Sequence, residues 1–423
     1  MTSDDDILAE HADEAAGLWS LRQSISRRPH VRLPDLAEHD ERIEAHLDGL
    51  RLAGGDGWRV AQELSAQAPR TSTLFVLAAL ACEADDADAR CATIAEAVLA
   101  DPTVVAGVVA GFTWVITPRT TSASSRWWLA DAPVLLQAAL GIDVASGRDP
   151  AARLTAACTH TDADLRAQAL CAAGELGRSD LMDRCRQALA DVQPACRSAA
   201  LWSLVMLGGE ATAALRAQAT RVTDHWAERL VDLAARRLPR ATVMDWLKND
   251  AAKAEHLRRA VHLAGAHGDT LVMPWLLMQL QIPAVARLAG QAFSLITGAD
   301  LEDAGLTGQP PAGFRAGPTD DPADPDVAPD PDEYLPWPDA DKVTAWWGRH
   351  ADTTPVGARH LLGRPLTSDH LEAVLCTGTQ PQRTAAASER AWLVPGRPLF
   401  DVMAPAARQL AALSTTNVAS SSA

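Results

Sequence analysis

The chain has 423 residues, is 48% hydrophobic and carries 38 basic against 54 acidic side chains, for a formal charge of −16. This charge would repel a phosphate backbone, so we expect no nucleic-acid partner, whereas a basic protein partner is compatible with it. The sequence has no run of about 18 apolar residues for a membrane span. Its acidic start lacks the basic and apolar parts of a signal peptide. We therefore expect a cytoplasmic protein, and the seven cysteines, without paired spacing, predict reduced thiols.

Residues 1–130 are predicted to form an irregular helical cap. Apolar residues recur at helical spacing in 11–23 and 34–50, and a glycine-rich break follows at 54–57. Further helices are expected over 72–83, 88–100, 104–114 and 127–140. The Thr- and Ser-rich stretch 117–125 is predicted to be a loop between the last two.

Residues 131–307 hold the strongest signal, a repeat of about thirty residues that is clearest after residue 160. Each repeat has an arginine near the start of an apolar helix and a helix breaker after it. The arginines are Arg166, Arg197, Arg229, Arg258 and Arg287, and the breakers are Gly177, Gly208, Leu238-Pro239, Gly268 and Gly298. Helix hairpins of this length bury their apolar faces only against neighbouring hairpins. The sequence therefore predicts an all-α, HEAT-like α-solenoid.

These five repeat arginines allow two interpretations. They can form an electrostatic ladder that binds an acidic ligand, or their stems can lie between stacked helices while their heads pair with nearby carboxylates. We expect the second, because repeat proteins reuse such positions for their own stacking. The glycine breakers are expected to adopt the left-handed conformation that ends a helix.

The composition changes at residue 308. Residues 308–341 hold nine prolines and nine acidic residues with one arginine, Arg315. This composition predicts a linker or an ordered strap, and we expect deletion of 319–331 to leave the fold intact. Residues 342–413 are predicted to form a C-terminal helical unit, and 414–423 a disordered tail.

Four side chains of the N-terminal region are candidates for metal binding or catalysis. His11 and Glu14 are spaced for one face of a helix, and Glu41 and His46 lie close together on the next one. A helical His-x-x-Glu pair can ligate a metal, but no second histidine completes a His-Glu-x-x-His motif. We therefore expect solvated or packing side chains, and we predict no catalytic residue, metal site or cofactor.

Three further patterns carry weaker signals. The spacing of the four cysteines from Cys158 to Cys196 matches no metal motif and predicts core packing. The run 54–57 resembles a phosphate-binding loop, but it follows a helix and lacks Gly-Lys-Ser/Thr, so a turn is predicted. The acidic run from Asp320 to Asp332 is interrupted by prolines and lacks a calcium-loop motif, so a solvated linker is predicted.

Several short motifs resemble a known family. They include HADEAAGLWSLR at 11–22 and LPWP at 335–338, and they continue at 36–50, 291–298, 377–383, 395–400 and 404–409. Together they resemble an uncharacterised bacterial family of HEAT-repeat proteins whose genes often lie beside type VI secretion effector genes. Pro381 stands where this family usually has a basic residue, so the helix there is expected to start later. The resemblance supplies no catalytic residue for this chain. It implies only that the gene lies near type VI secretion effector genes.

The leading functional hypothesis is a non-enzymatic protein–protein interaction module. It would be an adaptor or chaperone for a type VI secretion effector, or an immunity protein against one, and the acidic charge favours a basic partner. The alternative is a hydrolase or modifying enzyme with a site built from His11, Glu14, Glu41 and His46. A third hypothesis is a scaffold subunit of a housekeeping complex.

Overall fold

A computed structural model describes residues 4–420 except 83–85, 222–225, 319–322 and 324–326, without the side chains of 415–420. Most of the described residues are helical, and the strands among them are the antiparallel pair β1 (His360–Leu361) and β2 (Arg364–Pro365). The prediction of an all-α protein is therefore confirmed. The chain divides into two compact units, Met1–Glu210 with Ala391–Ala423 (unit 1) and Ala211–Arg390 (unit 2).

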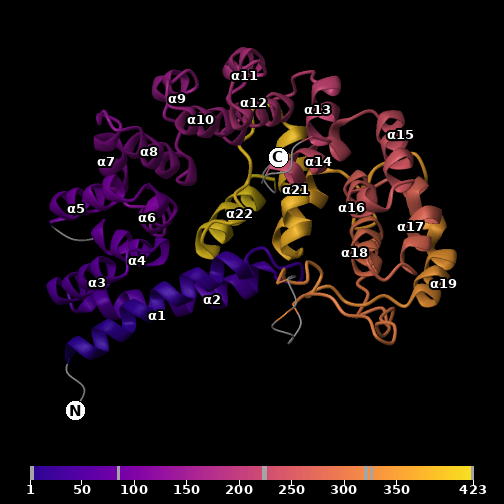
Figure 1. Cartoon of the computed structure of the whole chain (residues 1–423), viewed down its shortest axis with the longest axis horizontal. Helices are drawn as coiled ribbons and strands as arrows, with labels where there is room; N and C mark the ends of the chain where they lie inside the picture. Colours follow the sequence, from indigo (N-terminus) through magenta and orange to yellow (C-terminus); the bar gives the residue numbers. More distant parts are fainter. Residues whose placement is uncertain (1–3, 83–85, 222–225, 319–322, 324–326, 421–423) are drawn as a thin grey trace. The chain divides into compact units, whose positions relative to one another are not determined.

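Unit 1 holds the N-terminal helices and the last helix of the chain. These elements are α1 (Asp4–Ile25), α2 (Leu33–Leu52), α3 (Gly55–Gln67), α4 (Thr71–Ala81), α5 (Ala87–Ala100), η1 (Pro102–Val104), α6 (Val105–Phe112), α7 (Pro118–Trp127), α8 (Pro133–Ala145), α9 (Ala152–Ala157), α10 (Ala163–Glu175), η2 (Ser179–Leu181), α11 (Met182–Ala188), α12 (Pro194–Met206) and α22 (Ala406–Ser420). Figure 1 shows α4, α6, α8, α10 and α12 following one another, and each packs against the next.

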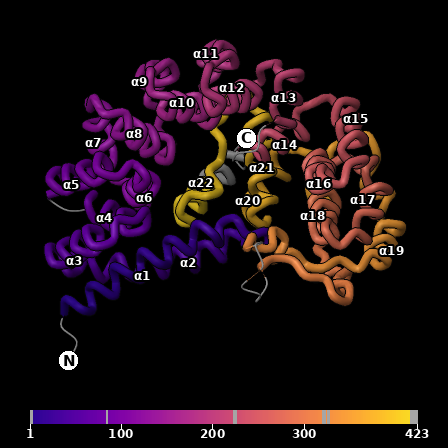
Figure 2. Tube along the Cα trace, viewed as in Figure 1, coloured from indigo at the N-terminus to yellow at the C-terminus, as the bar shows by residue number. Residues whose placement is uncertain are grey.

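Unit 2 repeats this pairing of helices. Its elements are α13 (Thr212–Ala219), α14 (Trp226–Arg237), α15 (Arg240–Ala251), η3 (Ala254–His256), α16 (Leu257–His267), η4 (Thr270–Val272), α17 (Met273–Gln279), α18 (Ala286–Thr297), α19 (Ala340–His350), η5 (Ala351–Thr353), β1, β2, α20 (Ser368–Thr377) and α21 (Gln380–Leu393), whose last three residues are assigned to unit 1. Helix α16 packs between α14 and α18, as the trace in Figure 2 shows.

The core of unit 1 is centred on α4, which is buried on all sides from Thr73 to Ala81. Two tryptophans flank the Phe75 ring of this helix: Trp19 stacks on it with ring centroids 4.9 Å apart, and Trp114 meets it edge to face at 5.2 Å. Glycines let α6 approach α4 closely, since a Cβ at Gly107 would lie 1.8 Å from the Thr71 carbonyl oxygen. Small residues at such crossings allow the backbones of two helices to touch.

Two local predictions are wrong because proline and threonine start helices here. The stretch 117–125 is not a loop but most of α7, which begins where Thr117 and Thr120 form a capping box around Pro118. Trp127 anchors this helix against Phe112, with ring centroids 5.3 Å apart. Likewise α21 begins at Gln380, so Pro381 occupies its first turn and does not delay its start.

The glycine breakers end their helices in the left-handed conformation, as predicted. The φ angles are +67° at Gly177, +87° at Gly208, +76° at Gly268 and +77° at Gly298. At three of these four positions the turn is also covered closely by a C-terminal part of the same unit. A Cβ at Gly268 would lie 2.4 Å from the His360 carbonyl oxygen.

C-terminal segments cover these helix ends in each unit separately. In unit 2, the amide of Leu362 donates to the Leu295 carbonyl at 2.8 Å, at the end of α18. In unit 1, the amide of Leu399 donates to the Glu175 carbonyl at 2.8 Å, at the end of α10. Residues 342–413, predicted as one helical unit, are divided between the two compact units after Arg390.

Helix α22 continues to Ser420, beyond the predicted end of the last helix at residue 413. Residues 406–420 contain no glycine or proline, so nothing in their composition interrupts the helix. The amide of Ala406 donates to the buried Asp40 carboxylate at 2.7 Å, which fixes the start of α22 against α2. Residues 421–423 of the predicted tail lie outside the described part of the chain.

The apolar helices of unit 1 include the candidate segments for a membrane span. Across the described residues, no single helix is long and apolar enough to cross a bilayer. The pair Ala87–Ala100 and Pro102–Phe112 has the length and composition only when taken together, and it bends by 120° at its break. The apolar side chains Ile94, Val98 and Phe112 of this pair are fully buried in the core of unit 1.

Candidate functional site

The repeat arginines of unit 1 are bound into the framework. Arg166 in α10 pairs with the Asp191 carboxylate at 2.7 Å, and its other donors reach the carbonyls of the turn before its own helix. Arg197 in α12 donates to the Asp191 carbonyl at 2.8 Å. Asp191 therefore links two successive repeats, and the hydrogen bond from Arg166 lowers the pKa of its carboxyl group.

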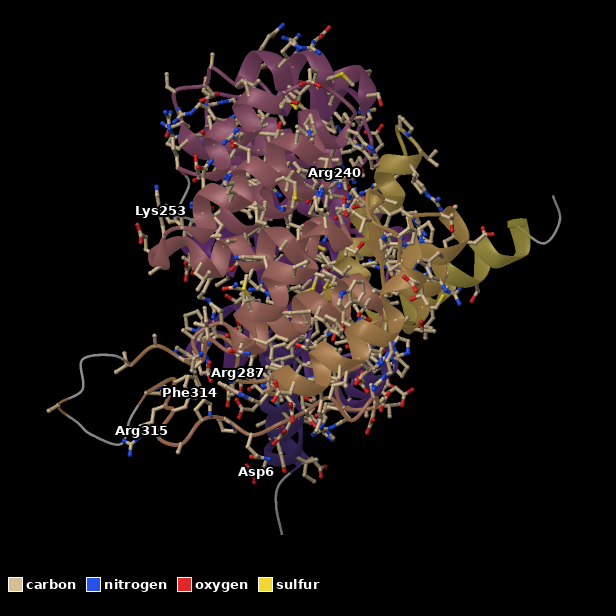
Figure 3. All side chains as sticks on the ribbon, turned by 90° about the vertical axis from the view of Figure 1, so that its right-hand side faces the viewer. Asp6, Arg240, Lys253, Arg287, Phe314 and Arg315 are labelled. Carbon is tan, nitrogen blue, oxygen red and sulfur yellow. The ribbon has the colours of Figure 1, made fainter. Side chains whose placement is uncertain are left out.

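Two repeat arginines of unit 2, Arg258 and Arg287, obtain their carboxylates from the strap, residues 308–341. Arg258 in α16 pairs with Asp332 at 2.7 Å, and Arg287 in α18 pairs with Asp330 at 2.7 Å. Arg287 also lies over the ring of Phe314, with its guanidinium carbon 5.7 Å from the ring centroid (Figure 3). These contacts are cation–π and charge-assisted interactions, which are stronger than neutral ones.

The strap is thus ordered where it meets α16 and α18. Asp332 is only 5% exposed, so the prediction of a solvated linker is wrong at this end. Deletion of 319–331 would remove Asp330 and its ion pair with Arg287, so we expect this deletion to lower the stability of unit 2 instead of leaving the fold unaffected. Asp320 and the other residues of 319–322 and 324–326 lie outside the described part, so the acidic run is placed only at its C-terminal end.

The remaining repeat arginine, Arg229, lies over the Trp226 ring at 4.8 Å from its centroid. All five repeat arginines therefore make contacts within their own units. These contacts favour the framework interpretation: Arg166 and Arg258 reach the turn before the next repeat helix, and Arg197 reaches the turn before its own helix.

Sequence reasoning missed a buried ionic cluster in unit 2. Glu389 in α21 is 2% exposed and accepts from Arg237 at 2.9 Å and from Arg236 at 3.4 Å, while Arg359 donates to it from the segment before β1. Burial alone would raise the pKa of Glu389, but the three guanidinium groups overcome this and lower it to about 2. The adjacent arginines at the end of α14 are the sequence signal, but nothing in the sequence indicates their partner.

Burial has the opposite consequence for Arg237. Desolvation lowers the pKa of Arg237 to about 10, and the negative charge of Glu389 offsets only part of this shift. A buried ion pair stabilises a fold only when every charge keeps its partner. The cluster is therefore a structural lock between α14 and α21 within unit 2, and it offers no group free for chemistry.

The N-terminal hairpin, formed by α1 and α2, carries the four candidate residues. The structure brings His11 and His46 together, with their Nδ1 atoms 3.0 Å apart. Glu14 and Glu41 are both exposed. Among the described residues, no group of three or more His, Cys, Asp or Glu side chains is arranged to hold a metal ion.

One face of α1 is strongly acidic. Four exposed carboxylates share this face, namely Asp6, Glu10, Asp13 and Glu14. Asp5, in the first turn, points to another side of the helix and pairs with Arg59 at 2.6 Å. The opposite face is buried through Ala12, Ala15 and Trp19. Near the end of the helix, Arg22 pairs with the buried Asp40 and donates to the Met403 carbonyl at 2.9 Å. The hairpin is therefore fixed in unit 1 while its acidic face remains in solvent.

The cysteines and the glycine run behave as structural elements. Burial raises the pKa of the Cys158 thiol to about 11 and that of Cys185 to about 12, so both stay protonated and unreactive near neutral pH. Gly54 has a φ of +59° in the turn before α3. A Cβ at Gly57 would lie 2.1 Å from the Leu50 carbonyl oxygen, so this glycine permits close contact between α3 and α2.

Comparison with known proteins gives no relative: no family model, no curated protein and no solved structure matches the chain. The functional argument therefore depends on the geometry of the N-terminal hairpin and of the repeats. In these regions the buried charges serve the fold, whereas the acidic face of α1 is exposed.

Proposed function

We propose that the chain is a HEAT-like α-solenoid that works as a non-enzymatic protein–protein interaction module. The successive packing of α4, α6, α8, α10 and α12, and of α14, α16 and α18, supports the solenoid. Each hairpin in such an array is covered by its neighbours and presents its outer surface to a partner. The internal use of the repeat arginines supports a scaffold whose periodic charges serve its own stacking.

The observation that carries the proposal is the acidic face of α1. Four carboxylates on the exposed face of α1, on a chain of net charge −16, attract a partner with a basic surface and speed its association. A basic protein is therefore the partner that this surface favours.

We further propose that the partner is a type VI secretion effector, with this chain as its adaptor, its chaperone or the immunity protein against it. The support is the resemblance of the short motifs at 11–22, 335–338 and 404–409 to a HEAT-repeat family encoded beside such effectors. Both roles place the protein in the cytoplasm, where an effector is made and where a toxin would have to be neutralised.

The direct test is co-purification with the product of the adjacent gene, followed by charge reversal on α1. Asp13→Lys with Glu14→Lys should weaken binding, and rising salt should weaken wild-type binding, since exposed charges are screened beyond about 8 Å at physiological ionic strength. The matched control is Asp303→Lys with Glu302→Lys, two exposed acidic residues of unit 2 with the same change in charge. Equal affinity for both double variants would contradict binding through α1.

Two further readouts separate the roles and the alternative. If the chain is an immunity protein, its co-expression should rescue cells from the toxin encoded by the neighbouring gene. If the chain is an adaptor, deletion of its gene should block export of the effector. The enzyme hypothesis would replace this proposal if the neighbouring product does not bind at low salt and His11→Ala abolishes a measurable turnover.

A further inference from the structure

The pair of His11 and His46 joins the two helices of the N-terminal hairpin. Their Nδ1 atoms lie 3.0 Å apart, and their rings meet edge to face with centroids 5.2 Å apart. In a tetrahedral site with metal–nitrogen bonds of about 2.0–2.1 Å, two nitrogen ligands lie about 3.3 Å apart. In that geometry each metal–nitrogen bond lies about 35° from the line between the two nitrogens, so a turn of both rings by about this angle directs both Nδ1 lone pairs at one ion.

The hairpin makes room for this pair at a cost to α2. Gly49 lies inside that helix, where glycine is less favourable than alanine by about 1 kcal/mol. Its φ is not positive, so the backbone does not require glycine there. A Cβ at Gly49 would lie 3.0 Å from Cδ2 and Nε2 of His11. The absence of a side chain thus lets the His11 ring lie flat against α2 and face His46.

We propose that His11 and His46 form a binding site for a divalent transition-metal ion, which imidazole ligands suit. Both side chains are partly exposed, so the ion can reach them. In the free pair one Nδ1–H donates to the other Nδ1; on binding, that proton moves through solvent to Nε2 of the same ring, which frees both Nδ1 lone pairs for the ion. The exposed carboxylates of Glu10 and Glu14 favour a cation here, while Arg42, one turn from His46, opposes it.

The site is open. In the described part of the chain no third His, Cys, Asp or Glu joins the pair, so water fills the remaining coordination positions. Such a site differs from a structural zinc centre, which has four protein ligands. It can be tested apart from the proposed partner binding, because replacing His11 by alanine leaves the carboxylates of α1 in place.

The test is calorimetric titration of the full chain with Ni²⁺, which suits imidazole nitrogen ligands. We expect one site per chain in the wild type and in the control variant His30→Ala, whose histidine lies in the connection between α1 and α2. His11→Ala and His46→Ala should each weaken that site by about tenfold or more. Gly49→Ala should weaken it as well, although both imidazoles remain, because the added methyl group displaces the His11 ring.

A second measurement guards against variants that misfold. Ni²⁺ should raise the melting temperature of the wild type and of His30→Ala but not of His11→Ala or His46→Ala, provided that all four have the same helical circular dichroism. The proposal is overturned if the wild type binds no Ni²⁺, or if the His11 and His46 variants bind it as tightly as the control. Failure here would leave co-purification with the neighbouring product unaffected, so the two proposals can be judged separately.

Discussion

The repeat arginines of the two units have the same place in their repeats but find their charged partners at different distances along the chain. Arg166 pairs with a carboxylate 25 residues ahead, at Asp191. Arg258 reaches the corresponding turn only through the Ala284 carbonyl, 26 residues ahead, and takes its carboxylate from Asp332, 74 residues away. The periodic sequence thus determines where the arginine lies, while the segment that covers the turn determines what it binds.

This comparison teaches that one repeat unit can be stabilised in two ways. In unit 1 the turn before the next helix supplies the Asp191 carboxylate to Arg166, and the turn before its own helix supplies the carbonyls. In unit 2 the turn before the next helix offers Arg258 the backbone carbonyl of Ala284, and the strap supplies the charge. The repeats of unit 2 should therefore depend on distant segments, and those of unit 1 on adjacent turns.

The largest effect should come from the most distant partner in unit 2. Glu389→Gln leaves Arg236, Arg237 and Arg359 buried without their shared carboxylate, and loss of one partner of a buried ion pair costs about 3–5 kcal/mol of unfolding free energy. Urea unfolding measures this loss. Glu302→Gln, an exposed site in the same unit, should change stability by less than about 0.5 kcal/mol. Similar small effects for both would show that the cluster does not stabilise unit 2.

The same cluster predicts a dependence on pH. The pKa of Glu389 is lowered from 4.5 to about 2 in the folded chain, so its contribution is complete above pH 4.5 and is lost as the pH falls through about 2. The stability difference between wild type and Glu389→Gln should therefore narrow over this range. A difference that stays constant down to pH 2 would contradict the lowered pKa.

The strap should contribute next. Asp330→Asn with Asp332→Asn removes the charges that hold Arg287 and Arg258, and hydrogen bonds to charged groups contribute about 1.5–3 kcal/mol each. Because the Arg258 side chain is 43% exposed, we expect a total loss of about 3 kcal/mol rather than the full sum. Chemical denaturation measures it, and an unchanged midpoint would mean that the strap only rests on α16 and α18.

A smaller effect is expected at the adjacent partner in unit 1. Asp191→Asn should cost about 1 kcal/mol, because Arg166 keeps its bonds to the carbonyls of His160 and Thr161 and Arg197 keeps the backbone carbonyl of residue 191. The measurement is the same unfolding titration. A loss as large as that of the strap variant would remove the distinction between the two units.

The smallest effect is expected when a repeat of unit 2 is given a carboxylate in the adjacent turn, as the repeat of Arg166 has in unit 1. Ala284→Asp places a carboxylate in the turn whose backbone carbonyl Arg258 already reaches. In an Asp332→Asn background it should restore up to about 1 kcal/mol, the usual limit for an exposed ion pair. Ala284→Asn is the matched control for the side chain without its charge. Equal stability of the two would mean that Arg258 needs the strap and not merely a carboxylate.

Helix positions and breakers could be predicted from the sequence because they depend on local chemistry. Gly268 and Gly298 end helices for a reason contained in glycine itself, the left-handed conformation. The error at 117–125 has a local cause too: Thr117 and Pro118 were interpreted as loop formers, although together they start α7. Composition alone does not separate a capped helix start from a loop.

The rest required distances that sequence spacing does not contain. Nothing near Arg237 indicates Glu389, 152 residues away, as its partner. The prolines and acidic residues of the strap predict a solvated linker, yet the Asp332 side chain is buried where it pairs with Arg258. At the N-terminal hairpin, helical spacing indicates His11 and His46 as candidates, but only the packing of α1 against α2 shows that these two side chains meet.

The central claim, that the repeat arginines serve the framework through different partners in the two units, is tested most directly by hydrogen exchange followed along the chain. Asp330→Asn with Asp332→Asn should speed amide exchange in α16 and α18 while α10 and α12 keep their wild-type rates. Asp191→Asn should do the reverse. If neither variant changes exchange in the helices that carry its arginines, those arginines are not part of the framework, and the electrostatic ladder for an acidic ligand becomes the better interpretation.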